Sequence, residues 1–115
     1  MIIQILQIVA AIATILTGLI SLFKPESITG FTGLRAEGGR GITEIRVVLG
    51  GLFVAIGAFP LIVNSPVAYT MLGVTYLTLG VVRAISMFLD KSVVQSNVIS
   101  LAVEIVFGII LVTPL

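Results

Sequence analysis

Four ionisable side chains interrupt otherwise apolar stretches of the sequence and are the residues best suited to chemistry: Glu44, Arg46, Arg83 and Glu104. A charged group among apolar residues is costly unless it is paired or reaches water. A carboxylate in such surroundings can act as a general acid or base, and an arginine can bind an anion or a polar head group. We therefore take these four residues, together with Tyr76, as the candidate ligand-binding site or buried charge network.

Much other chemistry is excluded by composition, because the sequence contains no Cys and no His. It supplies no thiolate nucleophile, no haem-ligating imidazole and no usual zinc or copper site. We expect no metal site and no cofactor. The net charge of +1 is far from the concentrated positive field of a nucleic-acid-binding protein, so nucleic acid is not expected as a partner either.

The elements that position these residues are long apolar segments. Hydrophobic residues make up 58% of the 115 residues and charged residues 10%, against roughly 45–50% and about 25% in soluble domains. A lipid bilayer is therefore the expected environment. Crossing its hydrocarbon core takes about 20 apolar residues. The windows of that length are Ile2–Phe23, Ile42–Val63, Pro66–Phe88 and Val93–Thr113.

These windows predict an all-α fold in which residues 1–115 form a single domain. The second and third breaks are short, and short connections imply antiparallel neighbouring helices. The first break is longer and rich in glycine, which opposes a stable helix, but Ile28, Phe31 and Leu34 recur at helical spacing. We predict an antiparallel four-helix transmembrane bundle with a short interfacial segment between helices 1 and 2.

Basic residues outside the windows predict the orientation. They lie in the 24–41 and 90–92 connections, whereas the second connection and both tails contain no Lys or Arg. Basic connections favour the cytoplasmic side. We expect an integral protein of the bacterial cytoplasmic membrane with these two connections in the cytoplasm and both termini outside.

Small residues recur in all four windows. Within lipid, their close packing drives helix association. The same pattern suits contacts between protomers, so a homo-oligomer or a larger membrane complex is an alternative to a monomer. The residues are Ala11 with Gly18; Gly50, Gly51, Ala55 and Ala58; Gly73 with Gly80; and Gly108.

Counting residues from the connections predicts that Arg83 pairs with Glu104 across the third and fourth helices, since an extended side chain can close most of the difference in depth. Helical spacing adds polar stripes that we expect to face inward as a seam. The stripes are Tyr69, Tyr76 and Arg83; Asn97, Ser100, Glu104 and Gly108; and Gln7, Thr14 and Ser21.

Each charged residue also has a purely structural interpretation. Glu44 can stabilise the positive end of the second helix with Arg40, one turn earlier, as its partner. Arg46 and Arg83 can extend to the lipid head groups. The Arg83–Glu104 pair can serve only to hold two helices together.

Three runs of the sequence carry a family resemblance, and they contain the four charged residues. They are Thr43-Glu44-Ile45-Arg46-Val47-Val48-Leu49-Gly50-Gly51; Leu79-Gly80-Val81-Val82-Arg83 with Asp90 at the helix end; and Val103-Glu104-Ile105-Val106-Phe107-Gly108.

In these runs the chain resembles a bacterial four-helix membrane family, domain of unknown function 4345, whose pattern reads N-E-I-R-A-x-Y-G-G, G-R and L-E-x-x-x-G. The sequence departs from that pattern at Thr43 and Leu49. It is also similar in length and layout to the broader DoxX-like group. The resemblance implies the fold and brings no established activity.

Three functions fit these features. The first is binding or transport of a small anionic or amphiphilic, lipid-like molecule in a polar cavity within the membrane. The second is a structural accessory subunit of a larger membrane complex. The third, an enzyme using Glu104 as its acid or base, ranks last because no nucleophile lies beside that residue in the sequence.

Overall fold

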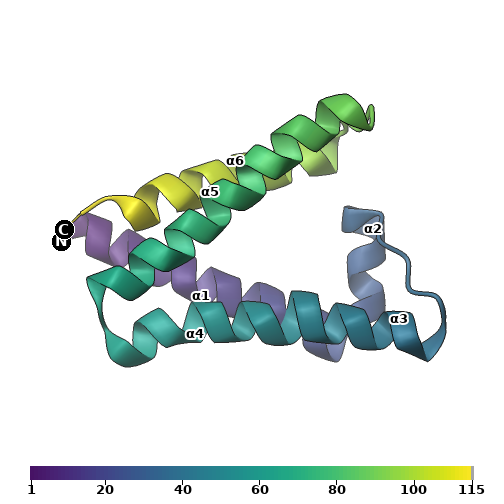
Figure 1. The fold of residues 1–115 in the computed structure, drawn as a ribbon. Helices are drawn as coiled ribbons and strands as arrows, with labels where there is room; N and C mark the ends of the chain where they lie inside the picture. Colours follow the sequence, from purple (N-terminus) through teal and green to yellow (C-terminus); the bar gives the residue numbers. More distant parts are fainter. Residues whose placement is uncertain (115) are drawn as a thin grey trace.

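The computed structural model describes residues 1–114, and its secondary structure over them is helical (Figure 1). The elements are α1 (Ile2–Phe23), the 3-10 turn η1 (Pro25–Ile28), α2 (Thr29–Thr32), α3 (Gly38–Glu44), the π-helical segment η2 (Ile45–Gly51), α4 (Leu52–Val63), α5 (Pro66–Leu89) and α6 (Gln95–Val112).

Within these residues, four helical runs are long and apolar enough to cross a membrane: Ile2–Phe23, Gly38–Val63, Pro66–Leu89 and Gln95–Val112. The four predicted windows and the short segment between the first two are thereby confirmed. Prolines in the sequence explain where some of these helices begin and end. Pro25 lies in the turn after α1, and Pro66 occupies the first turn of α5, where a missing N–H costs nothing.

The second spanning run begins at Gly38, four residues before the predicted start at Ile42. Glycine costs only about 1 kcal/mol per residue in a helix, and each residue added to an existing helix gains a hydrogen bond. The glycine-rich connection instead turns at Gly33 and at Gly38, where φ is +73° and +64°. Glycine adopts this left-handed conformation without steric cost.

A π-helical segment, η2, continues α3 into α4 and was not predicted. Its wider turn brings residues five apart onto one face, and both Ile45 and Gly50 are buried. Gly50 packs against the backbone of Leu22 in α1. The segment therefore keeps this part of the helix in contact with α1.

The helices associate as two pairs. α1 packs along η2 and α4, and α5 packs along α6. Figure 1 shows the pairs meeting at the end that carries both termini and diverging toward the other end, where α2 lies between them. Ala11, Tyr69, Leu72, Tyr76 and Leu111 belong to the buried cluster that joins the pairs.

Glycines allow the two helices of each pair to approach each other closely. A Cβ added at Gly18 would lie 2.7 Å from the carbonyl oxygen of Gly50, and one at Gly108 would lie 2.5 Å from a methyl carbon of Leu77. Gly57 and Gly73 are similarly enclosed. Small residues thus pack the helices together, as expected in lipid.

Gly51 and Ala55 were grouped with these small residues in the sequence, but their surroundings differ. Both residues are exposed, and an added Cβ at Gly51 would meet only its own helix, 3.8 Å from the Arg46 carbonyl oxygen. Gly51 therefore faces away from the other helices of this chain, whereas Ala55 is exposed at the side of α4 that turns toward α5.

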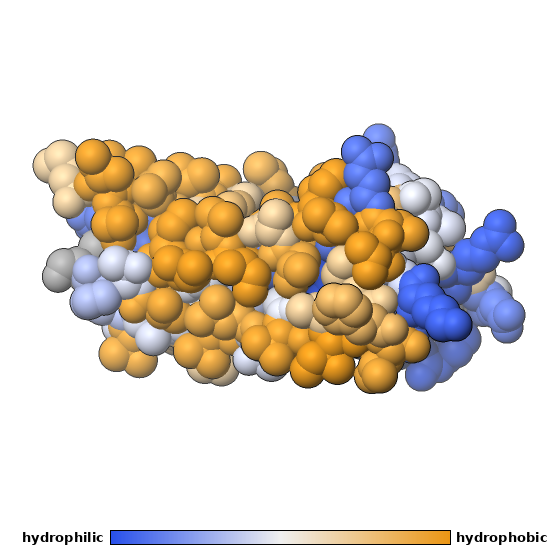
Figure 2. Space-filling view, turned by 90° about the horizontal axis from the view of Figure 1, so that it is seen from above, coloured by the Kyte–Doolittle hydropathy of each residue, from blue (hydrophilic) through white to orange (hydrophobic). Residues whose placement is uncertain are grey.

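Most of the molecular surface is apolar, as a bilayer requires. Figure 2 shows hydrophobic residues over most of the visible face and hydrophilic ones gathered at the end that carries α3 and the α5–α6 turn. The exposed charged residues at this end include Arg35 and Glu37 in the connection before α3, Arg40 in α3, and Asp90 and Lys91 in the α5–α6 turn. The apolar sides accordingly contact lipid, and one end is far more polar than the rest.

Candidate functional site

A bidentate ion pair joins α5 to α6. Nε of Arg83 donates to Oε1 of Glu104 at 2.8 Å, and Nη2 donates to Oε2 at 2.8 Å. The side chain of Glu104 is 8% exposed and that of Arg83 33%. The predicted pair is thus formed, with its carboxylate buried and its guanidinium partly accessible.

Asn97 completes the arrangement on the same face of α6, seven residues and about two helical turns before Glu104. Nη1 of Arg83 donates to Oδ1 of Asn97 at 3.0 Å, and Nδ2 of Asn97 donates to the Ser92 carbonyl oxygen at 2.9 Å. The amide is therefore oriented by the chain beyond the α5–α6 turn. We call Arg83, Glu104 and Asn97 the arginine clasp.

The arginine clasp leaves part of the guanidinium unused. An arginine side chain carries five N–H donors in a rigid plane. Within residues 1–114, Arg83 makes hydrogen bonds only to Glu104 and Asn97, using one hydrogen on each nitrogen. One N–H on Nη1 and one on Nη2 remain for an acceptor from outside this set.

Tyr76 lies seven residues before Arg83 on α5 and connects the helix pairs. Its hydroxyl is 2.5 Å from Oγ1 of Thr14 in α1, which itself donates to the Ala10 carbonyl oxygen at 2.8 Å. Because Thr14 has one hydroxyl hydrogen, Tyr76 is the donor when both bonds form. The Tyr76 ring also packs edge-on against Phe107 of α6, with centroids 5.5 Å apart.

Gln7 forms a second polar link between the pairs. Its Nε2 donates to the carbonyl oxygens of Ile110 at 3.1 Å and of Thr113 at 3.0 Å. Ser21 is buried and donates to the Thr17 carbonyl oxygen within its own helix. The expected stripe on α1 therefore faces inward.

The structure places Glu44 and Arg46 apart from the arginine clasp. Glu44, with a side chain 54% exposed, pairs with Arg40 one turn earlier. Arg46 is exposed as well. Among the described residues, neither forms a hydrogen bond or ion pair with Arg83 or Glu104. The arrangement of Glu44 matches its structural interpretation, a surface pair near the polar end of the molecule.

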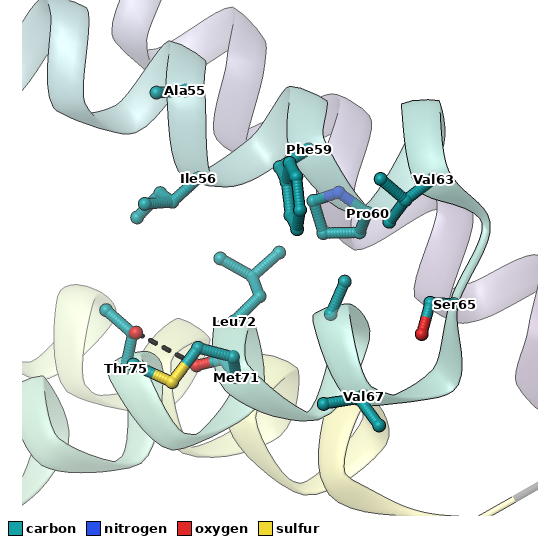
Figure 3. A pocket seen from close by; sticks show the side chains of 11 residues that line it. Ala55, Ile56, Phe59, Pro60, Val63, Ser65, Val67, Met71, Leu72 and Thr75 are labelled. Atoms are coloured by element: carbon teal, nitrogen blue, oxygen red, sulfur yellow. Dashed lines mark hydrogen bonds between the residues drawn. The ribbon is translucent and has the colours of Figure 1, made fainter.

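An apolar pocket of about 630 Å³, which the sequence did not indicate, lies between α4 and α5 (Figure 3). Thr75 and Ser65 supply its only hydroxyls, and Oγ1 of Thr75 already donates to the Met71 carbonyl oxygen at 2.9 Å. The pocket suits a hydrocarbon chain. Its other lining residues are Ala55, Ile56, Phe59, Pro60, Val63, Val67, Ala68, Met71 and Leu72.

The one available sequence signal for this pocket is Pro60 inside an apolar helix. Proline leaves the carbonyl four residues earlier without its helical partner and disturbs local packing. A second, smaller space of about 350 Å³ lies under the first connection, between Pro25, Arg35 and Ile42 among others. It is separate from the arginine clasp.

Four apolar helices, lipid-facing sides and an ion pair within the spans define the class: a small four-helix integral membrane protein. The family described as domain of unknown function (DUF4345) matches residues 2–115. The chain belongs to this family, and the resemblance seen in its sequence is confirmed. No curated protein and no solved structure matches the chain.

Proposed function

We propose that the protein binds an amphiphilic, lipid-like molecule whose polar group reaches the arginine clasp. This proposal rests on the exposure of Arg83 and on its unused hydrogen-bond donors. Its side chain is one-third exposed and retains two unclaimed N–H donors, although it lies within a membrane-spanning helix. A polar hydrogen without an acceptor in hydrocarbon is costly, so water or a ligand must accept it.

The arginine clasp holds these donors ready for a ligand. Glu104 fixes one edge of the guanidinium with two hydrogen bonds, and Asn97 takes a third. The remaining donors therefore point in a set direction before anything binds. Such preorganisation reduces the entropy cost of binding.

The apolar part of the proposed ligand can lie along α5. Thr75, at one edge of the apolar pocket, lies eight residues before Arg83, which is about 12 Å along a helix. Arg83 is seven residues, or about 10 Å, from Asp90 at the polar end of the molecule. A lipid-like molecule entering with its head near that end would thus extend its chain toward the pocket.

Retention of lipid by the purified protein tests the proposal. The protein is extracted in a mild detergent, and bound molecules are measured by native mass spectrometry and by analysis of an organic extract. The wild type is expected to hold a near-stoichiometric amphiphile. The double variant Arg83→Gln with Glu104→Gln is expected to lose it, because this neutral pair has fewer donors facing the ligand.

A matched control is available in the exposed pair, Arg40→Gln with Glu44→Gln, which removes the same two charges elsewhere. It is expected to retain the amphiphile. Equal retention by both double variants, or no bound molecule in the wild type, would reject binding at the arginine clasp. Size-exclusion profiles and thermal melts check that each variant is folded.

A structural subunit is the second candidate, and the exposed small residues Gly51 and Ala55 favour it. These small residues are one turn apart on α4 and η2 and would allow another helix to approach closely. Cross-linking between copies that carry Ala55→Cys in the membrane tests contact through this face, since the chain has no other cysteine. The same experiment with Ile62→Cys, which is exposed on another part of α4, is the control.

We also propose an orientation for the protein in the membrane. We place the polar end, with the 24–41 and 90–92 connections, in the cytoplasm, because those connections hold the basic residues outside the spans. The bound head group would then lie in the cytoplasmic leaflet.

A further inference from the structure

We infer that the group recognised at the arginine clasp is an uncharged hydrogen-bond acceptor, such as the carbonyl of an ester or amide, rather than a carboxylate or phosphate. This inference rests on the proposed function and names the chemistry of the ligand. Three features of the arginine clasp carry it: its charge balance, the polarity of its free groups, and the difference in exposure of its two charged members.

The charge of Arg83 is already neutralised. Glu104 contacts it through both oxygens at 2.8 Å, so the arginine clasp is neutral as a unit. No other Asp, Glu, Lys or Arg lies in the spans 2–23, 66–89 or 95–112. An anion would therefore bring an uncompensated negative charge to membrane depth, and that is unfavourable in a medium of low dielectric constant.

Arg46 and Glu44 in the second span do not alter this balance. Glu44 is paired with Arg40 near the polar end. Arg46 is exposed, and in the described part of the chain it forms no hydrogen bond or ion pair with the arginine clasp.

The free groups on the partly exposed guanidinium are donors, whereas the unused lone pairs of Glu104 belong to a side chain that is only 8% exposed. Arg83 has two N–H groups left. The Asn97 oxygen already accepts from Arg83, and its amide nitrogen uses one of two hydrogens on Ser92, so the amide offers one more N–H. A ligand group that accepts hydrogen bonds is complementary to these three N–H groups, whereas an ammonium or another donor is not.

The difference in exposure between Arg83 and Glu104 also favours a ligand group that accepts hydrogen bonds. Glu104 is 8% exposed and Arg83 33%, so an approaching ligand meets the guanidinium before the carboxylate. A cation attracted by Glu104 would have to displace Arg83 from it. A neutral carbonyl oxygen, with two lone pairs, can accept from the free guanidinium edge without disturbing the ion pair.

Probes of equal chain length test the inference. Purified protein in nanodiscs of ether-linked lipid of zero net charge, which has no ester carbonyl of its own, is titrated with oleic acid methyl ester, with oleate at alkaline pH, and with oleylamine. Binding is followed by native mass spectrometry. For the ester labelled with ¹³C at the carbonyl, infrared spectroscopy reports the hydrogen bond directly, because donation to the oxygen lowers the carbonyl stretching frequency.

The ester is expected to bind at least about tenfold more tightly than oleate or oleylamine, with a lowered carbonyl frequency. That frequency shift is expected to vanish in the variant with Arg83→Gln and Glu104→Gln and to persist in the variant with Arg40→Gln and Glu44→Gln. Tighter binding of oleate than of the ester, or an unshifted carbonyl in the bound ester, would overturn the inference.

The same titration separates the two proposals. If oleate binds more tightly than the ester and is lost in the Arg83→Gln, Glu104→Gln variant, the arginine clasp is a lipid site but its ligand is anionic. If no probe distinguishes wild type from that variant, the arginine clasp binds no amphiphile and both proposals fail.

Discussion

The hydroxyls of Thr14 and Tyr76 meet at 2.5 Å, although the residues are 62 positions apart in the sequence and belong to different helix pairs. The contact lies among the buried residues where the pairs come together. It links α1 to the helix that carries Arg83. The position of the arginine clasp relative to the other pair thus depends partly on this hydrogen bond.

Replacing Tyr76 with Phe should destabilise the fold by about 0.5–2 kcal/mol, because hydrogen bonds between membrane helices contribute about 0.6 on average and up to about 1.7 kcal/mol. Thr14→Val should cost a similar amount, and the two together less than their sum. A double-mutant cycle of unfolding in mixed micelles measures the coupling. Additive effects would show that the two hydroxyls do not stabilise each other.

Breaking the ion pair on one side should cost more than removing both partners. Glu104→Gln alone leaves the Arg83 charge without a partner at membrane depth, and such single removals cost about 3–5 kcal/mol in buried pairs. The variant with both Arg83→Gln and Glu104→Gln should be more stable than either single variant. Thermal melts and the yield of inserted protein report the order.

The exposed pair provides the contrast. Arg40→Gln, Glu44→Gln and their combination should each change stability by no more than about 0.5 kcal/mol, because an exposed pair one helical turn apart contributes little. A large loss in any of these variants would show that the polar end depends on this pair.

Alanine at Gly18 should strongly destabilise the protein, because its Cβ would meet backbone atoms of Gly50 at 2.7 Å and Val54 at 2.8 Å. Backbone atoms cannot move aside as a side-chain tip can, so the helices must separate. Gly51→Ala should be neutral or slightly stabilising, since it adds a better helix former at an exposed position. Melting temperatures of the two variants test the distinction.

The proposed orientation predicts the labelling of two introduced cysteines. Ser27→Cys, exposed in η1, should react with a membrane-impermeant maleimide only after the cells are permeabilised, whereas Pro114→Cys should react in intact cells. The native chain lacks cysteine and serves as the blank. The reverse pattern would place the polar end outside.

The sequence predicted the spans because their ends depend on local chemistry. Lys24, Pro25 and Pro66 mark ends that the structure retains within a residue or so. It also predicted the Arg83–Glu104 pair, because two opposite charges in adjacent antiparallel spans have few other partners in a membrane. Both inferences use only residue type and position along the chain.

What the sequence could not predict depends on packing around each helix. The π-helical turn at Ile45 has no periodic signature. Outside the polar stripes the helix faces are apolar all round, so periodicity does not show which small or apolar residues face another helix and which face lipid. For the same reason, the outward position of Gly51 and the pocket beside Pro60 appeared only in the structure.

The large sequence separation between Gln7 and its hydrogen-bond partners has a consequence for biosynthesis. Its amide donates to carbonyl groups 103 and 106 positions later in the chain. A ribosome delivers α1 to the membrane well before α6 exists. Until the last span has been inserted, the Gln7 amide donates to other acceptors, such as water or carbonyl oxygens of its own helix. The polar contacts of α1 therefore become complete only when synthesis of the helical region is nearly finished.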